Sequence, residues 1–275
     1  MSISMIDTLT AGIRAGEVIP CIGPEALADV RHRDSGTKIP ATSDELILAM
    51  NNGQPMAPRL MYEFPRAAMH IELKSGRSKV NRFLSDTYGP DVWTTSAMHL
   101  WLYGLNPPCI IDMNRDTGLQ KLYASTPHTL VTGVARIGGT QFRYKLFRHD
   151  GTGYTETDEA GIDPAAPVLF KPLGTPLPEA NFIASDADFV DYITELMGGF
   201  AIPGFLKTFR QGKRYALLGF PLSRDTERMI LHDLMYAGDG GWALMSAEPN
   251  RKGQQFCARH AIQPIVGASP LGAAA

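Results

Sequence analysis

The chain has 275 residues, of which 44% are hydrophobic and 20% are charged, and its formal net charge is −2. A chain of this length and apolar content can bury a full hydrophobic core without disulfides. The near-neutral charge leaves no basic footprint, which argues against nucleic acid as a partner. No apolar run approaches the roughly 20 residues of a membrane span, and no signal peptide is recognisable at the start. We therefore expect a cytoplasmic protein that does not bind membranes.

In chain order, short apolar runs alternate with segments of helix-like spacing. Strands are predicted at 18–23, 108–113, 129–134, 141–147, 168–171, 214–220, 241–246 and 262–266. Helices are predicted at 44–50, 61–73, 79–87, 95–103, 186–198 and 224–236. Several strands are almost continuously apolar, as expected for strands covered on both faces. This alternation predicts a doubly wound, mostly parallel, Rossmann-like α/β sheet.

Two segments interrupt the regular alternation. About eighty residues separate the first two strands, so we expect a single domain, 1–266, with a helical insertion at about 40–105. A loop or hairpin insertion is expected at about 135–167, with turns at the Gly138-Gly139 and Asp150-Gly151 pairs. The acidic stretch "DGTGYTETDEAGID" predicts a solvated loop, and residues 267–275 a flexible tail.

The three cysteines are far apart in the sequence. Cys21 and Cys109 stand inside the apolar runs "VIPCIG" and "PPCIID", which predicts buried thiols. Closely spaced pairs such as C-x-x-C are absent, so we expect no metal site.

The first candidate site is the turn after the first strand, in "GEVIPCIGPEALAD". A glycine turn leading into a helix is where α/β folds hold phosphates, because the helix N-terminus offers unpaired N–H groups. Here Gly23 is followed by a proline, which lacks an N–H, and by Glu25, whose carboxylate competes with a phosphate. Three interpretations stay open: a self-capped helix start, a modified nucleotide pocket that includes Gly23 and Glu25, and a catalytic role for Glu25.

Two further strand ends carry polar residues. Asn114 and Asp116 follow the strand in "CIIDMNRDTGLQKLY", and Gly219 and Asp225 follow the strand in "RYALLGFPLSRD". In open α/β sheets, ligands bind at the carboxyl ends of strands. The alternative at each place is local: Asp116 or Thr117 caps the helix after the first of these strands, and Asp225 caps the helix after the second.

The order of the stretches "CIGPEAL", "IIDMNRD", "LFKPLGTPLPEANFIASDADFVDYI" and "LLGFPLSRD" resembles the bacterial sirtuin-like NAD-binding domains, over residues 13–266. The resemblance implies an NAD-binding fold with Gly23, Glu25, Asn114, Asp116, Gly219 and Asp225 around NAD or a related adenine nucleotide. It also implies that Asn114 and Asp116 line the nicotinamide end, and that they are the catalytic residues if the chain is active.

The departures from the family pattern concern its polar positions. The second glycine and the serine of the family's first loop are replaced by Glu25 and Leu27. Leu173 stands where the family has a histidine, and Pro221 where it has a serine. His128 and His149 are considered as substitutes for the missing base, against the simpler interpretation of structural histidines.

These departures predict a catalytically degenerate domain. We expect it to act as a nucleotide-binding or assembly protein, with a protein partner or a homo-oligomer as possible associates. The alternative function is an active NAD glycohydrolase, and a third possibility is a scaffold whose cleft is filled by its own side chains. We also expect partial closure, in which the phosphate end is blocked and a pocket stays open beside Asn114 and Asp116.

Overall fold

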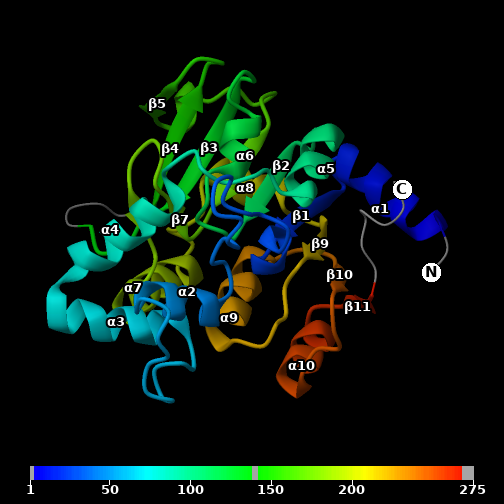
Figure 1. Cartoon of the computed structure of the whole chain (residues 1–275). Coiled ribbons are helices and arrows are strands. Elements are labelled where there is room, and N and C mark those ends of the chain that lie inside the picture. The colour runs from blue at the N-terminus through cyan, green and yellow to red at the C-terminus, as the bar shows by residue number, and fades with distance from the viewer. Residues whose placement is uncertain (1–2, 138–141, 268–275) are drawn as a thin grey trace.

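The computed structural model describes residues 3–137 and 142–267. A nine-stranded sheet in the order β11-β10-β9-β1-β2-β6-β3-β4-β5 runs through it (Figure 1). Its strands, in chain order, are β1 (Val18–Ile22), β2 (Cys109–Asp112), β3 (His128–Gly133), β4 (Tyr144–His149), β5 (Tyr154–Thr157), β6 (Val168–Lys171), β9 (Arg214–Leu218), β10 (Gly241–Met245) and β11 (Ile262–Val266). All neighbours are parallel except β3–β4 and β4–β5. The predicted α/β fold class is confirmed.

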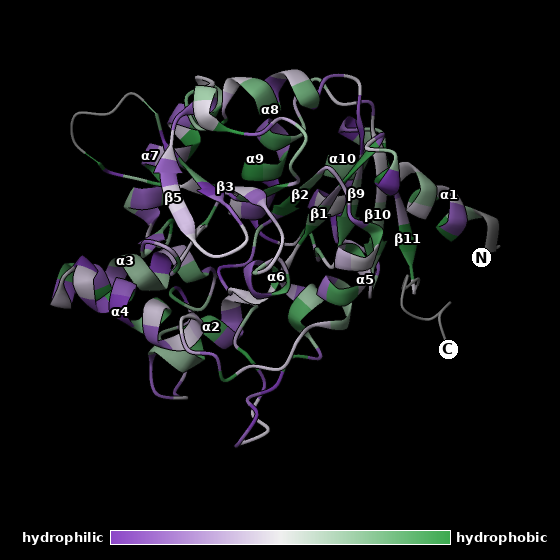
Figure 2. Cartoon of the chain, turned by 90° about the horizontal axis from the view of Figure 1, so that it is seen from above, coloured by the Kyte–Doolittle hydropathy of each residue, from purple (hydrophilic) through white to green (hydrophobic). Residues whose placement is uncertain are grey.

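Helices cover both faces of the sheet (Figure 2). One face packs on α1 (Ile3–Arg14), α5 (Ala97–Leu105) and α6 (Gly118–Leu122), and the other on α7 (Asp186–Met197), α8 (Gly204–Phe209), α9 (Asp225–Leu234) and α10 (Arg251–Arg259). Every residue of β1 is buried because its side chains alternate between the two layers. Ile19 and Cys21 join the α7–α10 core, whereas Val18 and Ile22 join the α1–α5 core.

The segment between β1 and β2 begins with the short 3-10 helix η1 (Pro24–Leu27). It continues through α2 (Ser43–Met50), α3 (Phe64–Ser75) and α4 (Arg77–Tyr88), which share a core cluster of their own. A capping box between Thr42 and Glu45 fixes the start of α2. The predicted insertion at 40–105 thus also contains α5, which packs on the sheet.

The segment 142–167 widens the sheet instead of forming only a loop. β4 pairs antiparallel with β3, and β5 pairs with β4 across the Asp150-Gly151 turn. The prediction of a solvated loop for "DGTGYTETDEAGID" is therefore wrong at Tyr154–Thr157. That stretch looks hydrophilic because it is an edge strand, none of whose side chains is fully buried. The 3-10 helix η2 (Glu159–Gly161) follows it. The predicted turn at Gly138-Gly139 and the tail at 268–275 lie outside the described residues.

The switch in winding direction lies between β1 and β9. The chain passes from β1 to β2 on the α5 face, and from β9 to β10 and β11 on the α9–α10 face. β1 and β9 are parallel neighbours, so the loops that follow them diverge. Such a point opens a crevice at the carboxyl edge of the sheet. The two-stranded sheet of β7 (Gly174–Thr175) and β8 (Asn181–Phe182) follows β6.

Two smaller predictions can also be compared with the structure. All three cysteines are buried and unbridged, and burial raises the pKa of the Cys109 thiol to about 12. Within the described ranges, no helix combines the length and apolar character that crossing a bilayer requires.

Candidate functional site

A cavity of about 320 Å³, which we call the switch-point cavity, lies where the ends of β1, β2 and β9 meet the helical insertion. The loops after the three strands contribute backbone and polar groups to it, and α2, α3, α7 and α9 supply the remaining walls. Its wall includes Pro24, Glu25, Glu63, Phe64, Asn114, Arg115, Leu173, Phe220, Pro221 and Glu227.

The turn after β1 has no N–H groups to offer a phosphate. Gly23 N donates to Leu218 O at 2.9 Å, and Glu25 N donates to Gly219 O at 3.0 Å. Pro24, between them, has no N–H. The turn of β1 is thus tied to the turn of β9, and the anion-binding use of this motif is lost here.

Glu25 does not cap its own helix, so the interpretation of a self-capped helix start is wrong. No side-chain hydrogen bond caps η1, and the Glu25 carboxylate instead accepts from Ser246 Oγ at 3.0 Å. The reason is local: η1 is a single 3-10 turn whose first N–H groups are already bonded to neighbouring backbone. Glu25 therefore stays a group of the cavity wall.

The two predicted glycines serve close packing of the turns. Gly219 has a positive φ of 72°, and a Cβ there would lie 2.8 Å from Ala26 N. A Cβ on Gly23 would lie 2.6 Å from both Gly219 O and the Phe220 ring. Both glycines border the site through backbone contacts with each other, and neither is among the residues of the cavity wall.

The residues after β2 divide between the two faces of the sheet. Asn114 lines the switch-point cavity, where its Nδ2 donates to Gly23 O at 2.9 Å. Asp116 lines a different cavity on the α5 face, and its Oδ2 accepts from Gly118 N at 2.7 Å at the start of α6. Asn114 and Asp116 therefore do not face the same cavity. The predicted capping role applies to one oxygen of Asp116, Oδ2, which accepts from the first residue of α6.

Asp225 also lies away from the switch-point cavity. Its carboxylate bonds Arg228 and, at 3.1 Å, Lys252 Nζ. The bond from Lys252, together with Arg228, lowers the pKa of Asp225 against the effect of its partial burial. Asp225 joins α9 to α10, and Glu227, two residues further on, reaches the cavity instead.

Two residues of the cavity wall were not predicted as site residues, and the first is Arg115. It is buried, its Nη2 donates to Ile183 O, and its guanidinium carbon lies 5.5 Å from the centre of the Phe64 ring. Burial lowers its pKa to about 10, so it stays cationic at neutral pH. Among the described residues it has no ion-pair partner, and its Nε has no hydrogen-bond partner.

The second is Glu227 on α9. Its Oε2 is shielded from solvent and lacks a hydrogen-bond partner within the described part of the chain. Burial raises the pKa of its carboxyl group to about 8, opposed by Arg228 and reinforced by Glu25. Glu227 is therefore mainly protonated at neutral pH and able to donate a hydrogen bond. No motif in the sequence distinguishes it from any other helical glutamate.

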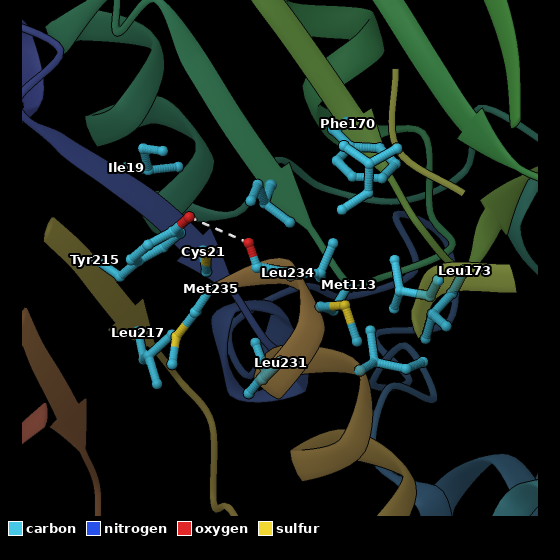
Figure 3. Close-up of a cluster of buried hydrophobic side chains, with 14 of the residues drawn as sticks. Ile19, Cys21, Met113, Phe170, Leu173, Tyr215, Leu217, Leu231, Leu234 and Met235 are labelled. Atoms are coloured by element: carbon cyan, nitrogen blue, oxygen red, sulfur yellow. Dashed lines mark hydrogen bonds between the residues drawn. The ribbon is translucent and has the colours of Figure 1, made fainter. Parts of the chain in front are cut away.

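Leu173, which the resemblance aligns with a histidine, is part of the hydrophobic core. It belongs to the same buried cluster as Met113 and Tyr215. Figure 3 shows Leu173 and Met113 at the end of this cluster away from Tyr215, whose hydroxyl donates to Leu234 O. The apolar wall of the cavity is thus continuous with the core, and it offers no proton-exchanging group at this position.

The histidines considered as substitutes lie at the other edge of the sheet. His128 begins β3, which is parallel to β6, and it is paired in register with His149 on β4. His128 Nε2 lies 2.7 Å from the Tyr154 hydroxyl, and burial lowers the pKa of His128 to about 4. Both histidines therefore lie at the amino end of the parallel strands. Asn114 lies at the carboxyl end, after β2, so neither histidine can reach it.

The second cavity, of about 330 Å³, lies on the α5 face, and we call it the α5 cavity. His99, Asp116, Thr117, Gly118 and Trp93 are among its lining residues. Beside it, the Lys171 ammonium lies 2.5 Å from Asp112 Oδ2, and both side chains are buried. Burial raises the pKa of Asp112, and Lys171 opposes this effect.

Comparisons with protein-family models and with curated proteins gave no match to this chain. The likeness to sirtuin-like domains therefore rests on the residues quoted above.

Proposed function

We propose that the chain binds a mononucleotide-sized ligand in the switch-point cavity, an adenine nucleotide or one half of NAD, without cleaving NAD. The observation that carries the proposal is that a protonated glutamate and a buried arginine, which has no ion-pair partner among the described residues, line one cavity at the switch point of the sheet. On this basis we infer a nucleotide-binding protein of the regulatory or assembly kind, in keeping with the resemblance to sirtuin-like domains.

The size of the ligand follows from the cavity and the turn beside it. Small-molecule pockets range over roughly 300–1,000 Å³, and about 320 Å³ lies at the lower end of that range. The N–H groups of Gly23 and Glu25 are bonded to backbone, so the turn does not bind a pyrophosphate. A ligand with one phosphate fits these limits better than a whole dinucleotide.

The polar groups of the wall match the parts of a mononucleotide. Arg115 offers a guanidinium to the phosphate, since this cation is held by a carbonyl and an aromatic face and not by a carboxylate. Glu227 and Glu25 offer hydrogen bonds to ribose hydroxyls. Phe64 and Phe220 give an apolar wall to the base.

Cleavage of NAD lacks its usual side chains in this cavity. Leu173 has no proton to exchange, and the Asn114 amide is already bonded to Gly23 O. Asp116, the other predicted catalytic residue, faces the α5 cavity. Purified protein incubated with NAD at high concentration should release no nicotinamide, as followed by HPLC.

The binding test compares AMP, adenosine, ADP-ribose and NAD by isothermal titration calorimetry. We expect AMP to bind more tightly than adenosine. Arg115→Gln should weaken AMP by about tenfold or more, because a charged hydrogen bond contributes about 1.5–3 kcal/mol, and should leave adenosine nearly unchanged. Glu227→Gln should weaken both ligands.

Glu17→Gln is the matched control, since Glu17 is exposed at the opposite end of β1. It should bind like the wild type. Absence of binding by all four ligands would refute the proposal and favour a scaffold.

One observation favours NAD glycohydrolysis as a second candidate. Glu227, with its pKa near 8, and the neighbouring Glu25 form a proton donor and a carboxylate in one cavity. Nicotinamide leaves NAD as a neutral base and needs no proton, so the Glu25 carboxylate would stabilise the oxocarbenium-like centre and take the proton of the attacking water, while Glu227 would donate to a ribose hydroxyl. Nicotinamide release that is abolished in both Glu227→Gln and Glu25→Gln would establish this function in place of simple binding.

A further inference from the structure

Three metal-ligating side chains meet on the α5 face of the sheet, away from the switch-point cavity. His99 comes from α5, Asp112 ends β2 and Asp116 follows it. One ligand atom from each side chain lies within 4.8 Å of the others, and all three residues are buried. Alternation along β2 explains the grouping, because Asp112 projects to the face opposite Met113.

His99 is the feature that calls for an explanation. It is 0% exposed, and neither Nδ1 nor Nε2 has a hydrogen-bond partner among the described residues. Asp116 Oδ1 is likewise buried without a partner. A buried polar atom without a partner costs about as much as a lost hydrogen bond, so native proteins rarely keep three such atoms side by side. His99 and Asp116 both line the α5 cavity.

The spacing of these groups suits an ion between them better than direct contact. In the described structure, no hydrogen bond or ion pair joins His99 to either aspartate, although their ligand atoms lie within 4.8 Å. A tetrahedral metal about 2.0–2.2 Å from each ligand atom holds those atoms about 3.4 Å apart, so metal binding would draw the three groups together by up to about 1.4 Å. Rotation of the His99 and Asp116 side chains toward Asp112 would supply that closure.

The charge balance of the cluster points the same way. Asp112 and Asp116 bring two carboxylates, and Lys171 brings one ammonium, bonded to Asp112 Oδ2. Lys171 pairs with Asp112 alone, so Asp116 has no ammonium or guanidinium partner among the described residues. Buried charges are normally paired or bound to metals.

We propose that His99, Asp112 and Asp116 bind a divalent transition-metal ion of the Zn²⁺ or Mn²⁺ class. One imidazole nitrogen and two carboxylate oxygens form a mixed donor set that suits these ions, whereas Mg²⁺ prefers oxygen ligands alone. The α5 cavity leaves room for water ligands and for entry of the ion. This proposal departs from the expectation of no metal site, which rested on the absence of closely spaced cysteines. The three ligands proposed here form no recognisable spacing motif in the sequence.

The test is calorimetric titration of the chelator-treated full chain with Zn²⁺, Mn²⁺ and Mg²⁺. We expect one Zn²⁺ per chain, weaker Mn²⁺ binding in keeping with the usual order of affinities, and no measurable Mg²⁺ binding. His99→Leu and Asp116→Asn should each weaken Zn²⁺ at least about tenfold. Zn²⁺ should also raise the melting temperature of the wild type and not that of His99→Leu.

A second histidine pair provides the control. His232 Nδ1 lies 3.0 Å from His260 Nε2 in an exposed position, where a zinc ion can also bind. His260→Ala should keep the tight Zn²⁺ site if the proposal is correct. Circular dichroism of metal-free His99→Leu should match the wild type, because the variant removes buried atoms that lack partners.

Two results would overturn the proposal. One is a wild type that binds neither Zn²⁺ nor Mn²⁺. The other is Zn²⁺ binding that persists unchanged in His99→Leu and Asp116→Asn but disappears in His260→Ala.

Discussion

The switch-point cavity and the α5 cavity lie on opposite faces of the sheet at the carboxyl end of β2, and they differ in chemistry. The first has the buried Arg115, a protonated glutamate and aromatic walls, and the turns at its strand ends are bonded to each other. The second has a histidine and an aspartate with unpartnered atoms beside a buried lysine–aspartate pair. Five consecutive residues, Asp112 to Asp116, contribute side chains to the two regions: Met113, Asn114 and Arg115 line the switch-point cavity, and Asp116 lines the α5 cavity with Asp112 beside it. Neighbouring side chains in one motif can therefore belong to two separate sites.

The largest expected effect comes from breaking the ion pair beside the α5 cavity. Lys171→Met leaves Asp112 buried without its ammonium partner, and we expect a loss of about 3–5 kcal/mol in the free energy of unfolding. Urea denaturation measures it. Lys145→Met, which breaks more exposed pairs with Glu179 and Glu156, should cost at most about 1 kcal/mol. Equal losses would mean that the Lys171 pair is not buried as described.

A second variant crowds the α5 cavity without touching the switch-point cavity. A Cβ on Gly118 would lie 2.6 Å from His99 Nδ1 and 2.7 Å from Asp116 Oδ2. Gly118→Ala should cost about 1–3 kcal/mol of stability and weaken Zn²⁺, with AMP binding unchanged.

Gly104→Ala, in α5, is the matched control, since nothing lies within 4 Å of its Cβ position. It should be neutral or stabilising by up to about 1 kcal/mol. Loss of AMP binding in Gly118→Ala would show that the two cavities are coupled.

The third prediction concerns the pH dependence that Glu227 gives to the switch-point cavity. Its folded-state pKa, about 8, is raised above the value of an unfolded glutamate. Its contribution to stability is therefore fully present below the unfolded pKa and is lost as pH rises toward 8.

Glu227→Gln removes this titration. Relative to the wild type, the variant should gain about 1–3 kcal/mol between pH 5 and pH 9, measured by urea denaturation at each pH. Parallel pH profiles of the two proteins would contradict the raised pKa. Glu17→Gln should keep the wild-type profile.

The smallest effect is expected at Glu25. Glu25→Gly removes a single exposed hydrogen bond, from Ser246, and should lower the free energy of unfolding by about 0.5–1.5 kcal/mol. It should not create binding of ADP-ribose, because the N–H at this position is bonded to Gly219 O. The sequence favoured the opposite outcome, since a carboxylate at a helix start suggests competition with phosphate for unpaired N–H groups. Calorimetric titration with ADP-ribose decides between the two.

The fold was predictable because the strands of a covered sheet are apolar throughout and stand out between amphipathic helices. β1, β2 and β6 lie within one residue of the predicted ranges, and β9 begins at the predicted residue and ends two residues early. β5 was missed because an edge strand needs few apolar residues. α10 was missed because its polar sequence, "RKGQQFCAR", buries only Gly253, Phe256 and Cys257.

The sequence predicted at which edge of the sheet the site lies, but not which side chains line it. Polar residues at strand ends identified Asn114 and Asp116, but the face that each would take depended on the path of the chain after β2. Arg115, Glu227 and His99 carry no motif; their properties arise from burial by elements distant in sequence. Gly219 was recognised as special, and its positive φ and close contact with η1 account for the glycine.

The separation of the two cavities is tested most directly by titrating AMP into the wild type, Arg115→Gln and Asp116→Asn under identical conditions. We predict that AMP binds the wild type and Asp116→Asn with equal affinity, and Arg115→Gln about tenfold or more weakly. Failure of the wild type to bind AMP, or an equal loss in both variants, would contradict the account.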